Sequence, residues 1–360
     1  MLRIAIIGCG KIADQHVQAI RRLADCEVVA ACDRELLMAR QLAERFQIPA
    51  TFADAAQMFQ ATAIDVVHIT TPPQSHFALG QQSLAAGKHV YLEKPFTVTA
   101  AEAETLIQLA GQKNLRITAG HNYQFTLEML EMRKLKAQNY LGGKPVHLES
   151  HWPYNLGDVS YVAPILGDRT HWVRQLPGQL FHNLISHGVS KLAEFLDDGP
   201  LEIVARGSQS PQLRAMGGGE VCDELRVLIR DASDTTAFFY FSTQLKPGLN
   251  QLRICGPANS LLVDHASGTL VRFPNRSYKS YLTFFGPPFM QAREHFRNGF
   301  ANVRNFLGRR LHQDSGMKEL IGQFYASIRA GAPVPIPYRE IILTARIMDE
   351  IFAQVHPPAR

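Results

Sequence analysis

A glycine-rich loop between an apolar strand and an amphipathic helix opens the chain and constrains its fold most strongly. The mostly aliphatic run Arg3–Ile7 leads directly into the sequence GCGKIA. In a G-x-G-x-x-A loop the first glycine permits a tight turn and the second lets the backbone approach a pyrophosphate. The small third residue lets helix and strand pack closely. The motif predicts dinucleotide binding by Gly8, Gly10, Lys11, Ile12 and Ala13.

A carboxylate ends the second predicted strand, Glu27–Cys32. Asp33 lies 20 residues after Ala13, where an acid can accept hydrogen bonds from the adenosine ribose. A carboxylate repels a 2′-phosphate, which favours NAD as the cofactor. The neighbouring Arg34 can pair with that phosphate, so NADP stays open.

Strands and helices continue to alternate to about residue 123. The pattern predicts further strands at Ile64–Thr70, His89–Leu92 and Arg116–Ala119, with helices at His76–Ala86 and Ala100–Gln112. Such alternation is typical of a doubly wound parallel sheet, the Rossmann fold, which binds ligands at the carboxyl ends of its strands. Thr71, Lys94 and His121 lie at those ends.

The pattern of the rest of the chain predicts mainly consecutive strands. These are Val146–Trp152, Leu201–Gly207, Glu224–Arg230, Thr235–Ser242, Gln251–Cys255 and Ser260–Asp264. We expect a dinucleotide-binding domain over 1–124 and an α+β domain with an open, mainly antiparallel sheet over 125–360. The open sheet is a candidate surface for a homo-oligomer, a dimer or tetramer. The last predicted helix, Arg339–Val355, is a candidate to pack back on the first domain.

Composition excludes several classes of protein. With 46% hydrophobic and 19% charged residues, the chain is not a disordered one. No apolar run is long enough to span a bilayer, and the N-terminus lacks the pattern of a secretory signal. The five cysteines are scattered without a CxxC pair, and the 14 histidines show no ligand spacing. We therefore expect a cytoplasmic protein with reduced thiols and no metal site.

The segment 289–311 concentrates positive charge. It holds five arginines and one glutamate, whereas the rest of the chain is nearly neutral. Its basic character is therefore local and does not indicate nucleic-acid binding. Apolar residues at Phe296, Phe300, Val303, Leu307 and Leu311 form a helical stripe, which we expect to pack on its own domain or on a neighbouring subunit. Contact with an anionic membrane surface is the alternative.

Taken together, the motifs resemble the glucose–fructose oxidoreductase/inositol dehydrogenase/rhizopine-catabolism (Gfo/Idh/MocA) family. The resemblance rests on GCGKIA, Thr71-Pro72-Pro73 with His76, Glu93-Lys94-Pro95, Gly120-His121-Asn122, and Asn183 four residues before His187. It implies an NAD(P)-dependent dehydrogenase that transfers a hydride between nicotinamide and a hydroxyl-bearing carbon of a sugar, cyclitol or nucleotide sugar.

The resemblance also implies roles for individual residues. Lys94, His187 and Asn183 would form the catalytic group, the last two on one face of a helix predicted over Phe181–Leu196. Cofactor contacts would include Thr71, Pro72, His76, Glu93, Lys94 and Asn122, and substrate contacts Tyr123, Trp152, Trp172 and His182. Two positions depart from the family pattern. Asn183 stands where aspartate is usual, and Gln124 where many members have arginine.

Two other functions stay open at this point. A redox-neutral glycosidase would use tightly held NAD transiently, oxidising a sugar to allow elimination and then reducing it again. A cofactor-binding sensor or scaffold without turnover would be consistent with the loss of charge at Asn183 and Gln124. Retention of Lys94 and His187 favours the dehydrogenase.

Overall fold

The computed structural model describes residues 1–156, 159–311 and 316–356, and the chain forms two compact units. Unit 1 comprises Met1–Asn122 and Gly316–Asp349, and unit 2 comprises Tyr123–Ser315 and Glu350–Arg360. The sequence analysis divides the chain once, after residue 124, whereas unit 1 takes in a segment from near the C-terminus.

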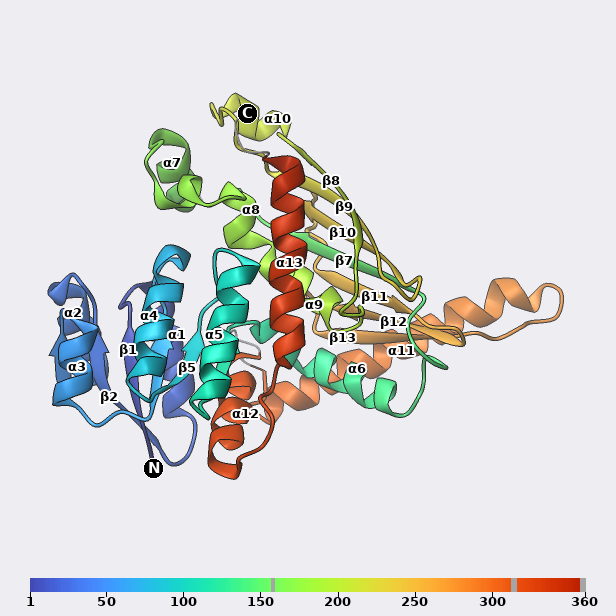
Figure 1. Ribbon diagram of the computed structural model, residues 1–360. Coiled ribbons are helices and arrows are strands. Elements are labelled where there is room, and N and C mark those ends of the chain that lie inside the picture. The colour runs from blue at the N-terminus through green and yellow to red at the C-terminus, as the bar shows by residue number, and fades with distance from the viewer. Residues whose placement is uncertain (157–158, 312–315, 357–360) are drawn as a thin grey trace. The chain divides into compact units, whose positions relative to one another are not determined.

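Unit 1 is built on a six-stranded parallel sheet with the order β3-β2-β1-β4-β5-β6 (Figure 1). Its strands are β1 (Leu2–Ile7), β2 (Cys26–Cys32), β3 (Ala50–Phe52), β4 (Val66–Ile69), β5 (His89–Leu92) and β6 (Ile117–Ala119). Its helices are α1 (Lys11–Arg21), α2 (Leu36–Phe46), α3 (Ala55–Ala61), α4 (His76–Ala85), α5 (Ala100–Gln112), α12 (Met317–Ala330) and most of α13 (Tyr338–Val355). This strand order confirms the predicted doubly wound fold.

The strand register gathers the functional loops at one edge of this sheet. Ile7 at the end of β1 pairs with Cys32 of β2 and Ile69 of β4, and Ile69 pairs with Leu92 of β5. All four side chains are buried. The loops that follow these strands therefore begin at the same level, at the edge where a Rossmann sheet binds its ligand.

Unit 2 contains a seven-stranded sheet with the order β13-β12-β11-β7-β10-β9-β8. The strands are β7 (His147–Pro153), β8 (Glu202–Ser208), β9 (Glu224–Arg230), β10 (Thr236–Ser242), β11 (Gln251–Cys255), β12 (Asn259–Asp264) and β13 (Thr269–Pro274). β7 and β10 are parallel and the other pairs antiparallel, which confirms the mainly antiparallel sheet. One face packs against α6 (Leu127–Ala137) and α9 (Ser186–Ala193).

The prediction of one continuous helix over Phe181–Leu196 is wrong. Two helices occupy this stretch, α8 (Gln179–Leu184) and α9, and Ile185 separates them. The carbonyl of Ile185 accepts hydrogen bonds from both Gly188 and Val189, which tightens the turn. α7 (Val159–Gly167), α10 (Pro211–Ala215), η1 (Pro73–Ser75), η2 (Asn122–Phe125), η3 (Trp172–Gln175) and β13 are further elements that the sequence analysis did not predict.

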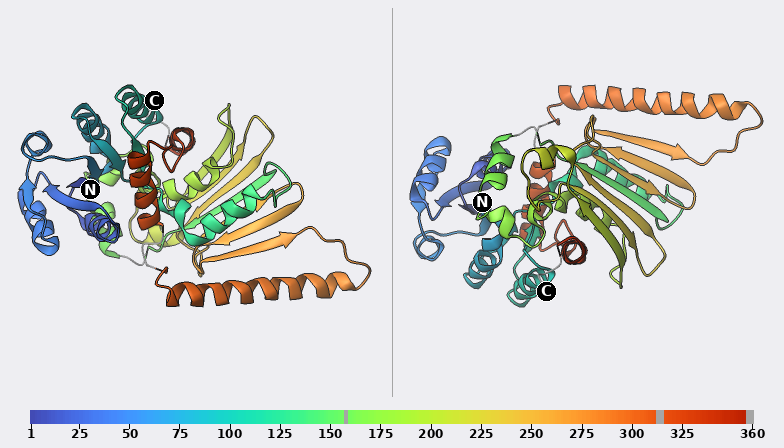
Figure 2. Two further views of the ribbon diagram at one scale, coloured as in Figure 1. Left: turned by 90° about the horizontal axis from the view of Figure 1, so that it is seen from below. Right: turned by 90° about the horizontal axis from the view of Figure 1, so that it is seen from above.

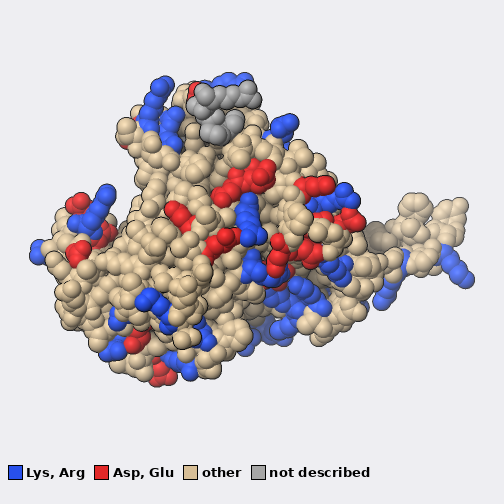
Figure 3. All heavy atoms as spheres, viewed as in Figure 1, with Lys and Arg blue, Asp and Glu red and all other residues tan. Residues whose placement is uncertain are grey.

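The basic segment belongs to a long helix, α11 (Leu282–Leu307), which lies along the edge strand β13 (Figure 2). Within unit 2 the helix buries Glu294 and Asn298 against this edge and leaves Phe296, Phe300 and Leu307 exposed. Of the two expected partners of the apolar stripe, its own domain is therefore wrong, and a neighbouring subunit stays a prediction. Figure 3 shows lysine and arginine, without acidic residues, where the chain enters this helix. No helix within 1–156, 159–311 and 316–356 is long and apolar enough to cross a membrane.

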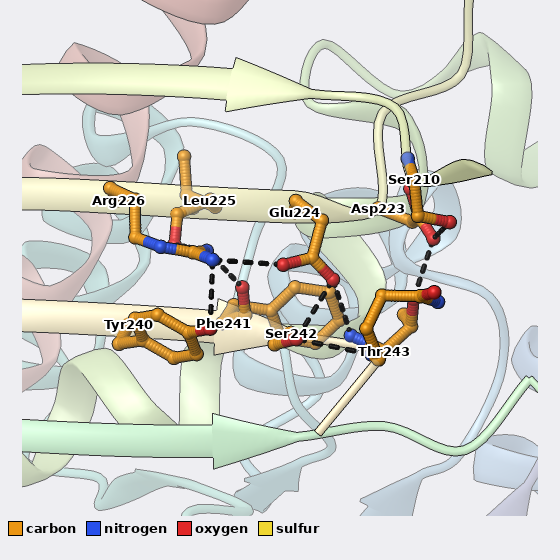
Figure 4. Close-up of polar contacts among 10 residues, drawn as sticks. Ser210, Asp223, Glu224, Leu225, Arg226, Tyr240, Phe241, Ser242 and Thr243 are labelled. Atoms are coloured by element: carbon orange, nitrogen blue, oxygen red, sulfur yellow. Dashed lines mark hydrogen bonds and ion pairs between the residues drawn. The ribbon is translucent and has the colours of Figure 1, made fainter. Parts of the chain in front are cut away.

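Polar side chains fasten the ends of β9 and β10 to the loop before α10 (Figure 4). The fully buried carboxylate of Asp223 accepts hydrogen bonds from the Ser210 backbone and hydroxyl and from the Thr243 hydroxyl. Next to it, Glu224 accepts hydrogen bonds from Ser242 and Arg226, and the Arg226 guanidinium lies over the Tyr240 ring. Both buried carboxylates accept hydrogen bonds from neighbouring side chains or backbone, so we assign Asp223 and Glu224 a role in stabilising the fold.

Candidate functional site

The glycine loop has the geometry of a phosphate cradle. Gly8 has φ +95°, and a Cβ there would lie 2.6 Å from Thr71 Cγ2, so only glycine fits without strain. A Cβ at Gly10 would meet no atom within 4 Å. The loop therefore leaves open space in front of the first turn of α1, where backbone N–H groups attract an anion. Ala13 is fully buried, as close packing of helix on strand requires.

Asp33 lies beside this loop as the sequence predicts. Its Oδ2 accepts a hydrogen bond of 2.8 Å from the Cys9 backbone N–H, and its Oδ1 accepts one from Glu35 N. The carboxylate is partly exposed, and Arg34 next to it is exposed. These bonds hold an acid at the position that recognises a ribose hydroxyl. Lys11 is exposed and Ile12 partly exposed at the start of α1.

His76 joins two loops of this edge. Its Nε2 lies 2.8 Å from the Thr71 carbonyl, and its Nδ1 lies 3.0 Å from the Pro95 carbonyl. The ring is fully buried, and burial lowers its pKa. His76 therefore holds the Thr71-Pro72 loop against the loop after Lys94, and its direct contact with a cofactor stays a prediction.

Lys94 follows β5, is partly exposed and lies next to the Glu93 carboxylate. Burial lowers the pKa of Lys94, and the adjacent Glu93 carboxylate opposes that shift. Glu93 accepts a hydrogen bond of 3.0 Å from the Lys94 backbone N–H and lies so close to Gly120 that a Cβ there would be 2.7 Å from Oε1. Burial lowers the pKa of His121, in the next loop, to about 4, so this ring is neutral at pH 7.

A chain of buried hydrogen bonds runs from Glu93 into unit 1. His16 Nε2 lies 3.0 Å from Glu93 Oε1, His16 Nδ1 lies 2.8 Å from His68 Nδ1, and Tyr325 Oη lies 2.7 Å from His68 Nε2. Burial would raise the pKa of Glu93, but the His16 hydrogen bond and the charge of Lys94 leave it lowered. With Glu93 ionised, His16 donates through Nε2, His68 donates through Nδ1 and the tyrosine hydroxyl donates to His68. Both histidines are then neutral and every bond is made.

In unit 2, three predicted site residues come together. The ring centroid of Tyr123 lies 4.7 Å from that of Trp152 and 5.0 Å from that of His187, and Trp152 lies 5.2 Å from His187. Gly188 makes this packing possible, because a Cβ there would lie 2.4 Å from Phe239. His187, at the start of α9, is 9% exposed and so keeps one accessible edge.

Two further polar residues line this aromatic cluster. Lys191 is fully buried, its Nζ lies 5.1 Å from the Trp152 ring centroid, and it donates to Asn250 Oδ1 over 3.3 Å. Burial lowers its pKa to about 7, against the charges of Glu128 and Asp264. His265 lies 5.4 Å from Tyr123, ring to ring, and 2.7 Å from Glu128 through Nδ1. Burial, followed by the Lys191 charge, lowers the pKa of His265.

Other predicted residues have different surroundings. His182 is 1% exposed and stacks on Phe352, and Trp172 is partly exposed beside His171. Asn183 lies in the last turn of α8, one short turn before His187. Gln124 is buried, and its amide donates to the Ser190 carbonyl, so a neutral side chain ties η2 to α9.

The sequence analysis missed Lys191, His265 and the chain from His16 to Tyr325. One signal for Lys191 exists, since it follows His187 by four residues inside an otherwise apolar stretch. His265 has no local signal, because the sheet brings it to Tyr123 from far along the chain. Of the two predicted catalytic residues, Lys94 lies in unit 1 and His187 in unit 2.

Comparison with known protein families gives a match that lies within unit 1. The Gfo/Idh/MocA oxidoreductase family model, an NAD-binding Rossmann fold, matches residues 2–121. D-glucoside 3-dehydrogenase of Escherichia coli is 32% identical over 142 residues, 39% of this chain and 40% of that protein. Inositol 2-dehydrogenase of Rhizobium meliloti is 23% identical and aligns over 69% of this chain and 71% of its own length.

The whole fold also has solved counterparts. The WlbA dehydrogenase of Bordetella pertussis, solved with NADH and UDP-GlcNAcA, superposes with a TM-score of 0.77 at 16% identity, covering 99% of this chain and 96% of that one. At this identity the likeness concerns the fold. The match to D-glucoside 3-dehydrogenase spans 40% of that relative, less than half its length.

Proposed function

Because the model of the Gfo/Idh/MocA oxidoreductase family, an NAD-binding Rossmann fold, matches residues 2–121, we propose that the chain is an NAD-dependent dehydrogenase of a sugar, cyclitol or nucleotide sugar. The observation that carries the proposal is the edge of the unit 1 sheet. There an open glycine cradle, the Asp33 carboxylate and Lys94 follow β1, β2 and β5, whose ends are brought to one level by the register of β2, β1, β4 and β5. Bound NAD supplies the acceptor for the substrate hydride.

The role of Lys94 follows from its setting. Its ammonium donates a hydrogen bond to the substrate hydroxyl oxygen and stabilises the negative charge that develops there during oxidation. The ionised Glu93 keeps this ammonium protonated despite burial, because the two opposite charges are adjacent. The buried chain through His16 and His68 positions Glu93 for this task.

His187 is the proposed general base for the same hydroxyl. Its imidazole takes the O–H proton as the hydride leaves carbon, so the substrate becomes a ketone. Asn183 orients His187 or a substrate hydroxyl, but a neutral amide does not stabilise an imidazolium as a carboxylate does. The base should therefore be weaker than in relatives with aspartate. The joint action of Lys94 and His187 is inferred from the family motif pattern.

Tyr123 and Trp152 are proposed to form the apolar wall against which a sugar ring packs, since both contact the His187 ring. Asp33 favours NAD over NADP by repelling a 2′-phosphate. We further propose a cytoplasmic enzyme, consistent with five free thiols, and a homo-oligomer formed through the outer face of the unit 2 sheet, where Leu228 and Phe238 are exposed.

The test is turnover of a panel of sugars, cyclitols and UDP-sugars with NAD, followed by nicotinamide absorbance. Lys94→Met and His187→Ala should each reduce kcat by about 10²–10⁴-fold while NADH still binds. Lys113→Met, an exposed lysine of the same unit, is the matched control and should leave kcat unchanged. Full activity of either active-site variant would refute the assignment, and aglycone release without net NADH would indicate the redox-neutral reaction.

A further inference from the structure

The orientation of α11 is the reverse of an ordinary surface helix. Its buried residues are polar. Glu294, 3% exposed, pairs with Arg272 of β13 and with Arg297, and Asn298 bonds to the Leu270 backbone. The helix is thus fixed to its own sheet through its polar side, and its apolar side faces outward.

The outward side is an apolar stripe in two runs. The first run is Leu282, Phe285 and Phe289, and the second is Phe296, Phe300, Val303 and Leu307, each at three- and four-residue spacing. The runs lie seven residues apart on one face of the helix, with Ala292 and the exposed Arg293 between them. Each residue of the two runs is between 58% and 75% exposed. Exposed aromatic side chains on this scale mark a surface that meets another apolar phase.

The charges beside the apolar stripe indicate whether a second copy of the chain or a lipid surface covers it. The exposed charges of the helix and the residues just after it are Arg293, Arg304, Arg309 and Arg310, all positive, and its one acid, Glu294, is buried and paired. A symmetric contact between two copies of this helix would bring arginines together.

We propose that α11 is an interfacial anchor that lies on an anionic lipid membrane. The phenylalanine stripe enters the boundary between headgroups and acyl chains, and the arginines beside it pair with lipid phosphates. The polar side keeps its bonds to β13, so the anchor holds without rearrangement of the fold. The anchor is separate from the site residues and is independent of the dehydrogenase assignment.

Vesicle flotation of the full chain tests the proposal. The protein should float with vesicles of phosphatidylglycerol and phosphatidylcholine, remain largely unbound to phosphatidylcholine alone, and lose binding as salt is raised. Phe296→Ser with Phe300→Ser should lower the bound fraction by about tenfold or more. Leu37→Ser, a change of an exposed apolar residue of α2, should bind like the wild type.

Three results would overturn the anchor. They are no flotation with anionic vesicles, equal flotation with neutral vesicles, or a wild-type dimer that the paired phenylalanine variant converts to monomer without any vesicle binding. Circular dichroism of each variant establishes that it is folded. Arg293→Gln with Arg304→Gln provides a second variant, which should weaken binding at low salt and leave secondary structure unchanged.

Discussion

The ammonium of Lys191 should destabilise the folded protein by an amount that depends on pH. Burial lowers its pKa from 10.5 to about 7. Between these values the unfolded chain binds a proton that the folded chain does not, so stability rises with pH through this window and is lowest at and below pH 7. The full shift corresponds to about 5 kcal/mol, and the part between pH 7 and 9.5 to about 3 kcal/mol.

Lys191→Met removes the charge and keeps an apolar chain of similar length. The variant should be more stable than the wild type at pH 7, because the buried ammonium costs more than the Asn250 hydrogen bond and the Trp152 contact contribute. Its advantage should shrink by about 3 kcal/mol between pH 7 and 9.5. The Lys191 charge also lowers the pKa of His265, but burial keeps that group titrating below its ordinary value of 6.5, outside this window, so it adds nothing to the difference between pH 7 and 9.5.

Urea unfolding at a series of pH values measures this difference. Both tryptophans of the chain, Trp152 and Trp172, belong to unit 2, so their fluorescence reports the unit that contains Lys191. Lys134→Met, an exposed lysine of α6, is the control and should show no pH-dependent difference. A stability difference between Lys191→Met and wild type that does not change with pH would refute the reasoning.

Three further predictions concern unfolding and ligand binding. Gly10→Ala should abolish NADH binding in a fluorescence titration, because its Cβ enters the open space of the phosphate cradle, and should change the free energy of unfolding by less than about 1 kcal/mol. Gly8→Ala should lower the free energy of unfolding by more than about 1 kcal/mol, because its Cβ clashes with Thr71 and its φ is strained. His68→Leu should cost about 2–4 kcal/mol in urea unfolding, since it leaves His16 and Tyr325 with buried unpaired atoms. Asp223→Ala should lower the thermal midpoint by several degrees, because it leaves three buried donors unpaired; unchanged values would contradict each assignment.

The dinucleotide-binding half was predictable because its signals are local. Each strand ends in a loop whose chemistry is written in a few adjacent residues, such as Gly8 to Ala13 or Glu93-Lys94-Pro95. The strand β5 and the helix α5 were predicted with their observed ends. Parallel pairing then places those loops at one edge without further information.

The rest depends on contacts between distant parts of the chain. Tyr123 of η2 meets His265 after β12, and His16 of α1 meets His68 of β4, only through the packing of helices against the sheets, which a single sequence does not reveal. The spacing of the α11 stripe was visible, but not the side of the helix that docks. That choice depends on Glu294 finding Arg272 on a strand that the sequence analysis did not predict.

The most direct test of the central claim is a titration of the purified protein with NADH and NADPH, followed by nicotinamide fluorescence, after any co-purified cofactor has been measured. The account predicts saturable, exchangeable binding that prefers NADH, and loss of that preference in Asp33→Ala. Binding of neither nucleotide, by a protein whose circular dichroism shows that it is folded, would contradict the account.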